Sequence, residues 1–158
     1  MNTKSILANP NKSRSARHRS REFALQAMYQ WLVNKDTPEA IIEHIRQAHG
    51  FDKADYAHFV ALVSETIHQS PALWEVMRPF LDRPIADLSP VEHAILLIGT
   101  YEMQSHIEIP YRVVINEAVE LAKSFGGVDG HKFVNGVLDR IAAHVRQTEQ
   151  EAGDTQKG

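Results

Sequence analysis

Cysteine is absent from this 158-residue chain, which excludes disulfide bonds and zinc sites built on thiolates. Long hydrophobic runs are also absent. The longest is 94–98, far short of the roughly 20 apolar residues that cross a membrane. No apolar stretch follows the basic N-terminus, so a secretory signal is not indicated. We therefore expect a cytoplasmic protein.

Motifs for catalysis and cofactor binding are missing as well. The chain has no Walker loop, no G-x-S-x-G and no G-x-G-x-x-G. Its nine histidines are scattered, and none forms the His-x-x-x-His spacing of a helical metal site. Glu117 and Glu120 share a helix face, but Glu120 and Lys123 have the spacing of an ordinary surface pair. We expect no metal, no cofactor and no enzymatic activity.

Charge is distributed unevenly along the chain. Residues 1–21 contain six basic residues and no acid, so the rest carries a net charge of −9 against −3 for the whole. A basic arm on an acidic body suggests an anionic partner. For Lys4 and Lys12 a solvated tail is the simpler interpretation. The cluster at Arg17, Arg19 and Arg21 favours a function, because it continues directly into a helix.

Apolar residues recur at helical spacing over most of the chain, and no alternating stretch predicts a sheet. The pattern indicates an all-α fold of about seven helices packed as two small bundles. We expect a disordered basic arm over 1–13, a helical body over 14–147 and a flexible acidic tail over 148–158. The expected helices cover about 15–32, 38–49, 53–69, 71–77, 90–101, 112–125 and 130–145.

Capping signals support several of these helix starts. Thr37–Glu39 reads as an N-cap, a proline at the first helical position and a first-turn acid. Ser89–Glu92 is a capping box with proline at its first helical position. Asp52 is expected to cap the third long helix, and Asp129 the last one. Glycines at 50 and 126–127 are expected to end helices.

Nucleic-acid binding has two candidate regions. Arg17, Arg19 and Arg21 spread around one helix, which suits several phosphates of a flexible strand. The turn before the last helix combines glycines with a positive helix end and the donors of His131 and Lys132.

Aromatic residues in and near these regions have two interpretations. Phe133 could stack on a base, but spacing alone favours a core position, because Phe133, Val137 and Ile141 form an apolar stripe. Tyr29 and Tyr101 are similarly ambiguous, since their rings pack while their hydroxyls reach a rim.

Three segments carry a resemblance to a known family. RSARHRSREFALQAMYQW is similar to the Arg-rich opening of NusB proteins, and SPVEHAILLIGTYEM to their middle helix. The stretch IPYRVVINEAVELAKSFGGVDGHKFVNGVLDRI is close to the family pattern nearly end to end. Together they cover 14–34, 88–103 and 109–141. The chain thus resembles the NusB family of bacterial transcription antitermination factors, which are all-α.

The resemblance implies a function and a set of contacts. Such proteins pair with NusE, a small-subunit ribosomal protein, recognise single-stranded boxA RNA of ribosomal RNA leaders, and help RNA polymerase to read through terminators. The chain is expected to be a monomer or a homodimer, and the sequence does not distinguish the two. The NusE side would include Tyr29 and Glu92. On the resemblance, Phe133 becomes a contact rather than core. The implied RNA side is Arg17, Arg19, Arg21, Asp129, Lys132 and Phe133.

Two positions depart from the family pattern. His18 stands where an arginine is common, so the arm is expected to bind RNA slightly less tightly near neutral pH. Leu97 stands where the pattern often has arginine. Its side chain would replace a surface charge, or add an apolar spot that favours a partner or self-association.

Two other functions are compatible with these residues. NusB-like helical domains also serve as RNA-binding appendages of ribosomal RNA cytosine-5 methyltransferases. Those enzymes need a cofactor-binding α/β domain and catalytic cysteines, which this sequence does not contain. A helical adaptor that binds a protein groove through its apolar faces is the remaining alternative.

Overall fold

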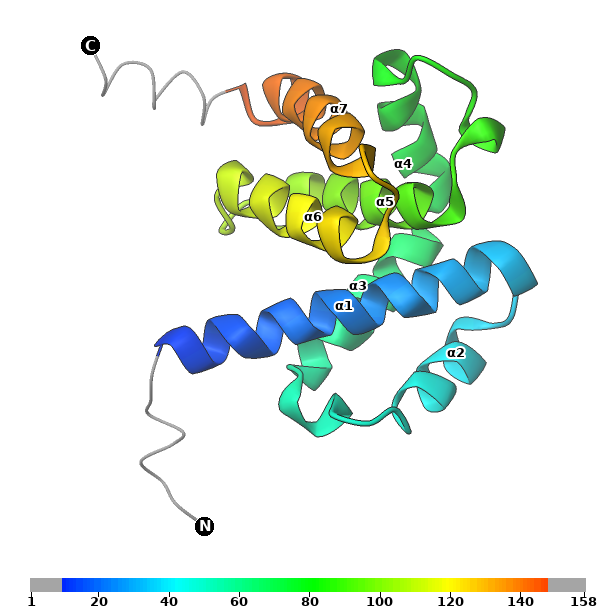
Figure 1. The fold of residues 1–158 in the computed structure, drawn as a ribbon, viewed down its shortest axis with the longest axis vertical. Coiled ribbons are helices and arrows are strands. Elements are labelled where there is room, and N and C mark those ends of the chain that lie inside the picture. The colour runs from blue at the N-terminus through cyan, green and yellow to red at the C-terminus, as the bar shows by residue number, and fades with distance from the viewer. Residues whose placement is uncertain (1–9, 148–158) are drawn as a thin grey trace. The chain divides into compact units, whose positions relative to one another are not determined.

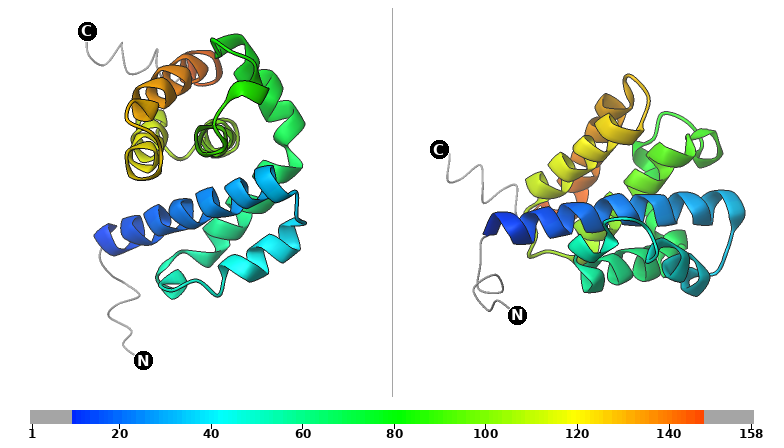
Figure 2. Two further views of the ribbon diagram at one scale, coloured as in Figure 1. Left: turned by 45° about the vertical axis from the view of Figure 1, so that its right-hand side comes forward. Right: turned by 60° about the horizontal axis from the view of Figure 1, so that its bottom comes forward.

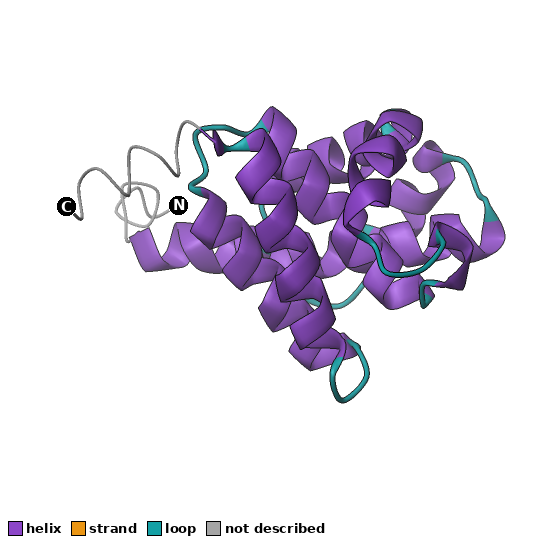
Figure 3. Ribbon diagram, turned by 90° about the horizontal axis from the view of Figure 1, so that it is seen from above, coloured by secondary structure: helices purple, strands orange, loops and turns teal. Residues whose placement is uncertain are grey.

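The computed structural model describes residues 10–147, with side chains from residue 15 onward, and every regular element in that range is a helix (Figure 3). The prediction of an all-α fold is confirmed. None of these helices is both long and apolar enough to cross a membrane. The described residues divide into two compact units, with the boundary between Ile67 and His68, which confirms the expected pair of bundles. Each unit is described by itself below.

The first unit is built around one long helix that lies beside a short one (Figure 1). Its core centres on the ring of Phe51, which meets Phe23 and Phe59 edge to face at 5.2 and 5.0 Å between ring centroids. Such aromatic pairs add to the free energy gained from burying the rings. The elements are α1 (Pro10–Asn34), α2 (Pro38–Ile45), η2 (Phe51–Lys53) and α3 (Tyr56–His68).

The second unit is built around α5, whose residues 94–103 are all buried. A helix that is apolar on all sides belongs in a core, and α5 contacts α4, α6 and α7. The left view of Figure 2 looks along α5, with α4 and the pair α6 and α7 around it. The elements are α4 (Ser70–Met77), η3 (Arg78–Phe80), η4 (Ile85–Asp87), α5 (Pro90–Ser105), α6 (Tyr111–Phe125) and α7 (Gly130–Val145).

Burial in α5 corrects one prediction. Leu97 is 0% exposed, so it adds no apolar spot to the surface and the expected surface role was wrong. The position belongs to the core of the second unit, where a leucine side chain packs without a charge to solvate. Close packing continues at Gly99, where an added Cβ would lie 3.0 Å from both terminal methyls of Leu138. The small residue allows α5 and α7 to approach closely.

Two of the predicted caps form as expected. The hydroxyl of Thr37 accepts from the Ala40 amide at 3.2 Å. The hydroxyl of Ser89 accepts from the Glu92 amide at 3.2 Å and donates to a Glu92 carboxylate oxygen at 2.9 Å. Both helices therefore begin where their sequence signals place them.

Two other predicted caps differ from expectation. Asp55, not Asp52, caps α3 and accepts from the His58 amide at 3.1 Å, because Phe51–Lys53 forms a separate short turn of 3₁₀ helix. Asp129 occupies the N-cap position of α7, but its side chain makes no capping hydrogen bond.

Two expected helix boundaries differ in the structure, and a third lies where it was predicted. α2 ends at Ile45, before Gly50, whose φ of +83° instead precedes the short turn at 51–53. α1 begins at Pro10 rather than near Ser15, so 10–13 of the expected arm is helical. Gly126 follows α6 as predicted, because a Cβ there would lie 2.7 Å from the Ala122 carbonyl oxygen. The rest of the arm, 1–9, and the tail, 148–158, lie outside the described residues.

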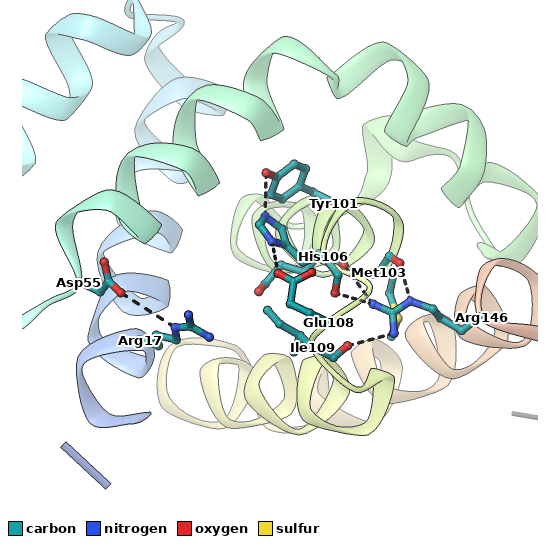
Figure 4. A network of polar contacts seen from close by, with 9 residues as sticks. Arg17, Asp55, Tyr101, Met103, His106, Glu108, Ile109 and Arg146 are labelled. Atoms are coloured by element: carbon teal, nitrogen blue, oxygen red, sulfur yellow. Dashed lines mark hydrogen bonds and ion pairs between the residues drawn. The ribbon is translucent and has the colours of Figure 1, made fainter. Parts of the chain in front are cut away.

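A buried arginine that the sequence did not single out closes the second unit (Figure 4). Arg146 directly follows α7 and is 2% exposed. Its guanidinium donates to the carbonyl oxygens of Met103 at 2.6 Å, Ile109 at 3.0 Å, His106 at 2.9 Å and Glu102 at 3.3 Å. These charged hydrogen bonds tie the connection between α5 and α6 to the end of α7.

Candidate nucleic-acid interface

The arginine cluster lies on α1, in the first unit. The side chain of Arg17 is 50% exposed, and its Nε lies 4.0 Å from a carboxylate oxygen of Asp55 (Figure 4). An exposed ion pair at this distance is weak, so the Arg17 guanidinium can exchange Asp55 for another anion at little cost. Arg19 is partly exposed. Both arginines are accessible to a phosphate.

Arg21 differs from its two neighbours. It is 4% exposed and engaged in interactions within the protein. A buried guanidinium cannot exchange its partners as freely as a surface one. The predicted cluster therefore divides into two accessible arginines and one buried arginine.

A buried serine positions the α1 cluster. Ser20 is 0% exposed, and its hydroxyl donates to the Asp55 carbonyl at 2.7 Å and accepts from the Asp55 amide at 2.8 Å. The Asp55 amide also lies 3.2 Å from the Ala16 carbonyl oxygen. One turn of α1 is thus fastened to the segment that precedes α3, between Arg17 and Arg21. These hydrogen bonds fix the part of α1 that carries the arginines, so the arginines do not lie on a free tail.

Tyr29 lies further along the same helix. It is 44% exposed, and Val33, one turn later, is 50% exposed, so the two form an apolar strip on α1. Twelve residues separate Arg17 from Tyr29, which is about 18 Å along a helix. The arginines and the tyrosine therefore present separate surfaces of one helix. Nε2 of His18, which lies between the two accessible arginines in sequence, is 3.7 Å from a carboxylate oxygen of Glu22.

The predicted residues of the second unit gather at the start of α7. Phe133 is only partly buried, whereas Val134, Val137 and Ile141 are 0% exposed. The core stripe of α7 therefore includes Val134 and not Phe133. The ring of Phe133 is covered by the guanidinium of Arg83, 4.6 Å from the ring centroid. This pair is a cation–π contact at the surface.

Arg83 is itself surrounded by acids. Its Nε donates to Asp82 at 2.8 Å, and this hydrogen bond lowers the pKa of Asp82 and raises the pKa of Arg83. The carboxylates of Glu92 and Asp87 raise the pKa of Arg83 further. Arg83 was not predicted from the sequence, because it lies in an irregular connection rather than on a periodic helix face.

Glu92 joins the predicted RNA turn to the predicted partner site. A Cβ added at Gly130 would lie 3.0 Å from a Glu92 carboxylate oxygen, so Glu92 packs directly against the first residue of α7. Lys132 lies 3.5 Å from Asp129, and both are highly exposed. The structure thus brings Glu92, Asp129, Lys132 and Phe133 together. Arg17, Arg19, Arg21 and Tyr29 lie in the other unit.

The remaining polar clusters of the second unit make contacts within it. Among residues 10–147, no group of three histidines or acids is arranged to hold a metal ion. The His106 ring is hydrogen-bonded through Nε2 to the Tyr101 hydroxyl at 3.0 Å and through Nδ1 to a Glu108 carboxylate oxygen at 2.8 Å. This ring lies beside the carbonyls that Arg146 contacts (Figure 4). His93 accepts from the indole of Trp74 at 2.8 Å, and burial lowers its pKa. These histidines tie the second unit together.

Comparison with known proteins identifies the family. The model of the NusB family matches residues 18–143. The transcription antitermination protein NusB of Ralstonia nicotianae is 58% identical over 136 residues, which are 86% of this chain and 88% of that protein. The chain belongs to the NusB family. The match includes α1 from His18 onward, α5, and α7 up to residue 143, so every predicted contact except Arg17 lies within it.

Solved structures agree with this membership in the NusB family. T. maritima NusB superposes with a TM-score of 0.72 at 29% identity, covering 80% of this chain and 89% of that one. The antitermination factors NusB and NusE in complex with dsRNA give a TM-score of 0.70 at 23% identity, covering 80% of this chain and 96% of the matched chain. At that identity the likeness concerns the fold alone.

Proposed function

We propose that this NusB-family chain is a transcription antitermination factor. It binds the boxA RNA of ribosomal RNA leaders together with ribosomal protein NusE, and it helps RNA polymerase read through terminators. The observation that carries the proposal is the family match over 18–143 with a relative that is 58% identical and named a transcription antitermination protein. The protein acts by binding and performs no catalysis.

The RNA side combines phosphate contacts and stacking. Arg17 and Arg19 are accessible, and each can bind a phosphate with its planar guanidinium. Phe133 offers a ring edge and, once Arg83 moves, a ring face to a base. Lys132 and Asp129, 3.5 Å apart at the start of α7, supply a donor and an acceptor for the same nucleotide. Arg21 supports the arm from within the protein.

The protein partner side is assigned to Tyr29 and Glu92. Tyr29 is a half-exposed aromatic residue beside Val33, which is the kind of residue that dominates protein interfaces. Glu92 adds negative charge at the start of α5 and lies against the turn that carries Phe133. A partner that contacts Glu92 therefore lies close to RNA that contacts Phe133, so RNA and NusE can be bound side by side.

This arrangement explains cooperation by avidity. Each partner alone binds modestly, because the exposed arginines and one aromatic ring supply few contacts. When NusE occupies its surface and also contacts the RNA, the second contact becomes intramolecular and the strand is bound more tightly without new contacts on this chain.

The test is fluorescence anisotropy of a labelled boxA RNA and a scrambled control, titrated with this protein with and without NusE at two salt concentrations. We expect salt-dependent binding that NusE strengthens for boxA but not for the scrambled strand. Equal affinity for both strands with NusE present would refute the proposal. Sedimentation of the free protein shows whether a homodimer covers the binding surface.

A further inference from the structure

A polar groove between α6 and α7 has no part in the function proposed above. Its volume is about 240 Å³, and it lies wholly within the second unit. It is lined by Tyr111, Arg112, Ile115, Asn116, Asn135 and Asp139. α6 and α7 are the most closely packed helix pair of the unit, so both walls of the groove are firmly placed.

The side chains in this groove carry unused hydrogen-bonding capacity. Asn116, Asn135 and Asp139 are exposed, and within the described part of the chain no hydrogen bond or ion pair involves their side chains. Asn116 lies one turn after Arg112 on α6, and Asp139 lies one turn after Asn135 on α7. Each helix therefore presents two polar side chains on one face. Four polar groups from two helices thus converge on one space.

The chemistry of these groups matches the edge of a nucleobase. Two side-chain amides offer donors and acceptors, the carboxylate of Asp139 accepts, and the guanidinium of Arg112 donates. Amide, carboxylate and guanidinium groups are the ones that read base edges. The Arg112 guanidinium lies over the Tyr111 ring, 5.4 Å from the centroid, and adds a flat surface suited to stacking. Ile115, 7% exposed, provides an apolar floor.

The groove is continuous with the proposed RNA surface. Lys132 precedes Asn135 by three residues on α7, so both lie along one stripe of the helix together with Asp139. Lys132 and Asp139 are about 10 Å apart along the axis. A strand whose phosphate contacts Lys132 can therefore place a neighbouring base at Asn135.

We propose that the groove between α6 and α7 is an accessory subsite that binds one base of a single-stranded RNA. The assignment rests on the proposed RNA-binding function and extends it to a second site on α7. The amides of Asn116 and Asn135 read the edge of the base, and Arg112 with Tyr111 stacks against its face. The subsite gives the protein base selectivity in addition to its phosphate contacts.

Nuclear magnetic resonance of the ¹⁵N-labelled full chain tests the subsite directly. AMP, CMP, GMP and UMP are titrated separately, and the side-chain amide signals of Asn116 and Asn135 are followed. We expect both signals to shift, most strongly with one of the four nucleotides. The amide of Asn34, exposed at the end of α1, serves as the internal control and should not respond.

A coupling experiment then connects the groove to RNA. Each position of boxA RNA is replaced in turn by an abasic nucleotide, and affinity is measured for the wild type and for the Asn116→Ala/Asn135→Ala double variant. We expect one position at which base loss weakens wild-type binding about tenfold but leaves the variant unchanged. Asn34→Ala should behave as the wild type does.

The outcomes separate this inference from the proposed function. Binding of boxA RNA with no coupled position and no amide shift would overturn the subsite and leave the function standing. Absence of boxA binding even with NusE would overturn the function, and the nucleotide titration would still decide the groove. Shifts of the two amides on adding NusE, but not any nucleotide, would assign the groove to a protein and overturn the inference.

Discussion

The guanidinium of Arg83 lies 4.6 Å from the centroid of the Phe133 ring and is hydrogen-bonded to Asp82. The contact covers a partly buried aromatic ring that lies at the start of α7 without entering the core. Because the side chain of Arg83 is 43% exposed, the contact is weak and can be replaced by a stacked base. Arg83 is then free to bind a phosphate of the same strand.

Replacement of Phe133 by leucine should separate stacking from packing. Phe133→Leu retains an apolar side chain but removes the ring, so we expect RNA affinity to fall about 5- to 100-fold, as for the loss of one stacked base. The thermal transition should change little, because the residue is only partly buried. The control Leu138→Ala should cost about 2–5 kcal/mol of stability. A collapse of the thermal transition in Phe133→Leu would place the residue in the core.

The three arginines of α1 should differ in their variants. Arg17→Ala and Arg19→Ala should each reduce the slope of log affinity against log salt by about 0.7, the value for one phosphate contact of a single strand. Arg21→Ala should instead lower the free energy of unfolding, because Arg21 is 4% exposed. Salt titrations and urea denaturation measure the two effects. Arg46→Ala, at an exposed position directly after α2, is the control. A slope equal to wild type in Arg17→Ala would remove the arm from the RNA site.

Charge reversal at Glu92 should weaken binding of NusE. Glu92→Lys removes the acid that lies against Gly130 and places a cation near Arg83. Ser89→Ala is the matched variant, because it removes the helix cap, worth about 1 kcal/mol, and leaves the charge of Glu92 in place. Calorimetric titration with NusE should show a loss for Glu92→Lys only. An equal loss in both variants would mean that the cap, not the charge, is responsible.

Loss of Arg146 should destabilise the second unit strongly. Arg146→Met retains much of the buried volume but removes the charged donor from the carbonyls of Met103, Ile109 and His106, and only the His106 carbonyl keeps a backbone donor, the Ile109 amide. We expect the free energy of unfolding to fall by about 3–5 kcal/mol, from lost charged hydrogen bonds and unsatisfied buried acceptors. Urea denaturation measures it. Arg140→Ala, which removes one exposed bond to the Phe80 carbonyl, should cost about 1 kcal/mol or less.

Stability should depend on pH through His93. Burial lowers the pKa of His93 below its ordinary value of 6.5, and the neutral ring accepts the Trp74 indole hydrogen bond at 2.8 Å. Below about pH 6.5 the unfolded chain takes up a proton that the folded chain does not, so stability falls as pH drops through that value. His93→Gln retains an acceptor without titrating. Thermal unfolding from pH 5 to 8 should show a shallower decline for this variant, and identical slopes would exclude His93 as the cause.

Local sequence was sufficient for most of the helices. The caps at Thr37 and Ser89 formed because one side chain bonds an amide within its own first turn, which depends on neighbouring residues alone. The end of α6 at Gly126 is equally local. Asp52 was the wrong cap because a second acid, Asp55, lies three residues later, and local signals cannot choose between two adjacent candidates.

The sequence by itself determined the helical class, most helix boundaries and the family, because periodicity, capping and motif order are properties of the linear chain. Only the tertiary structure showed that Leu97 and Arg21 are buried, that Arg83 covers Phe133 and that Arg146 bonds four carbonyls. These features depend on side chains from elements far apart in sequence. Burial and long-range pairing are set by how helices pack, and helical periodicity describes each helix alone.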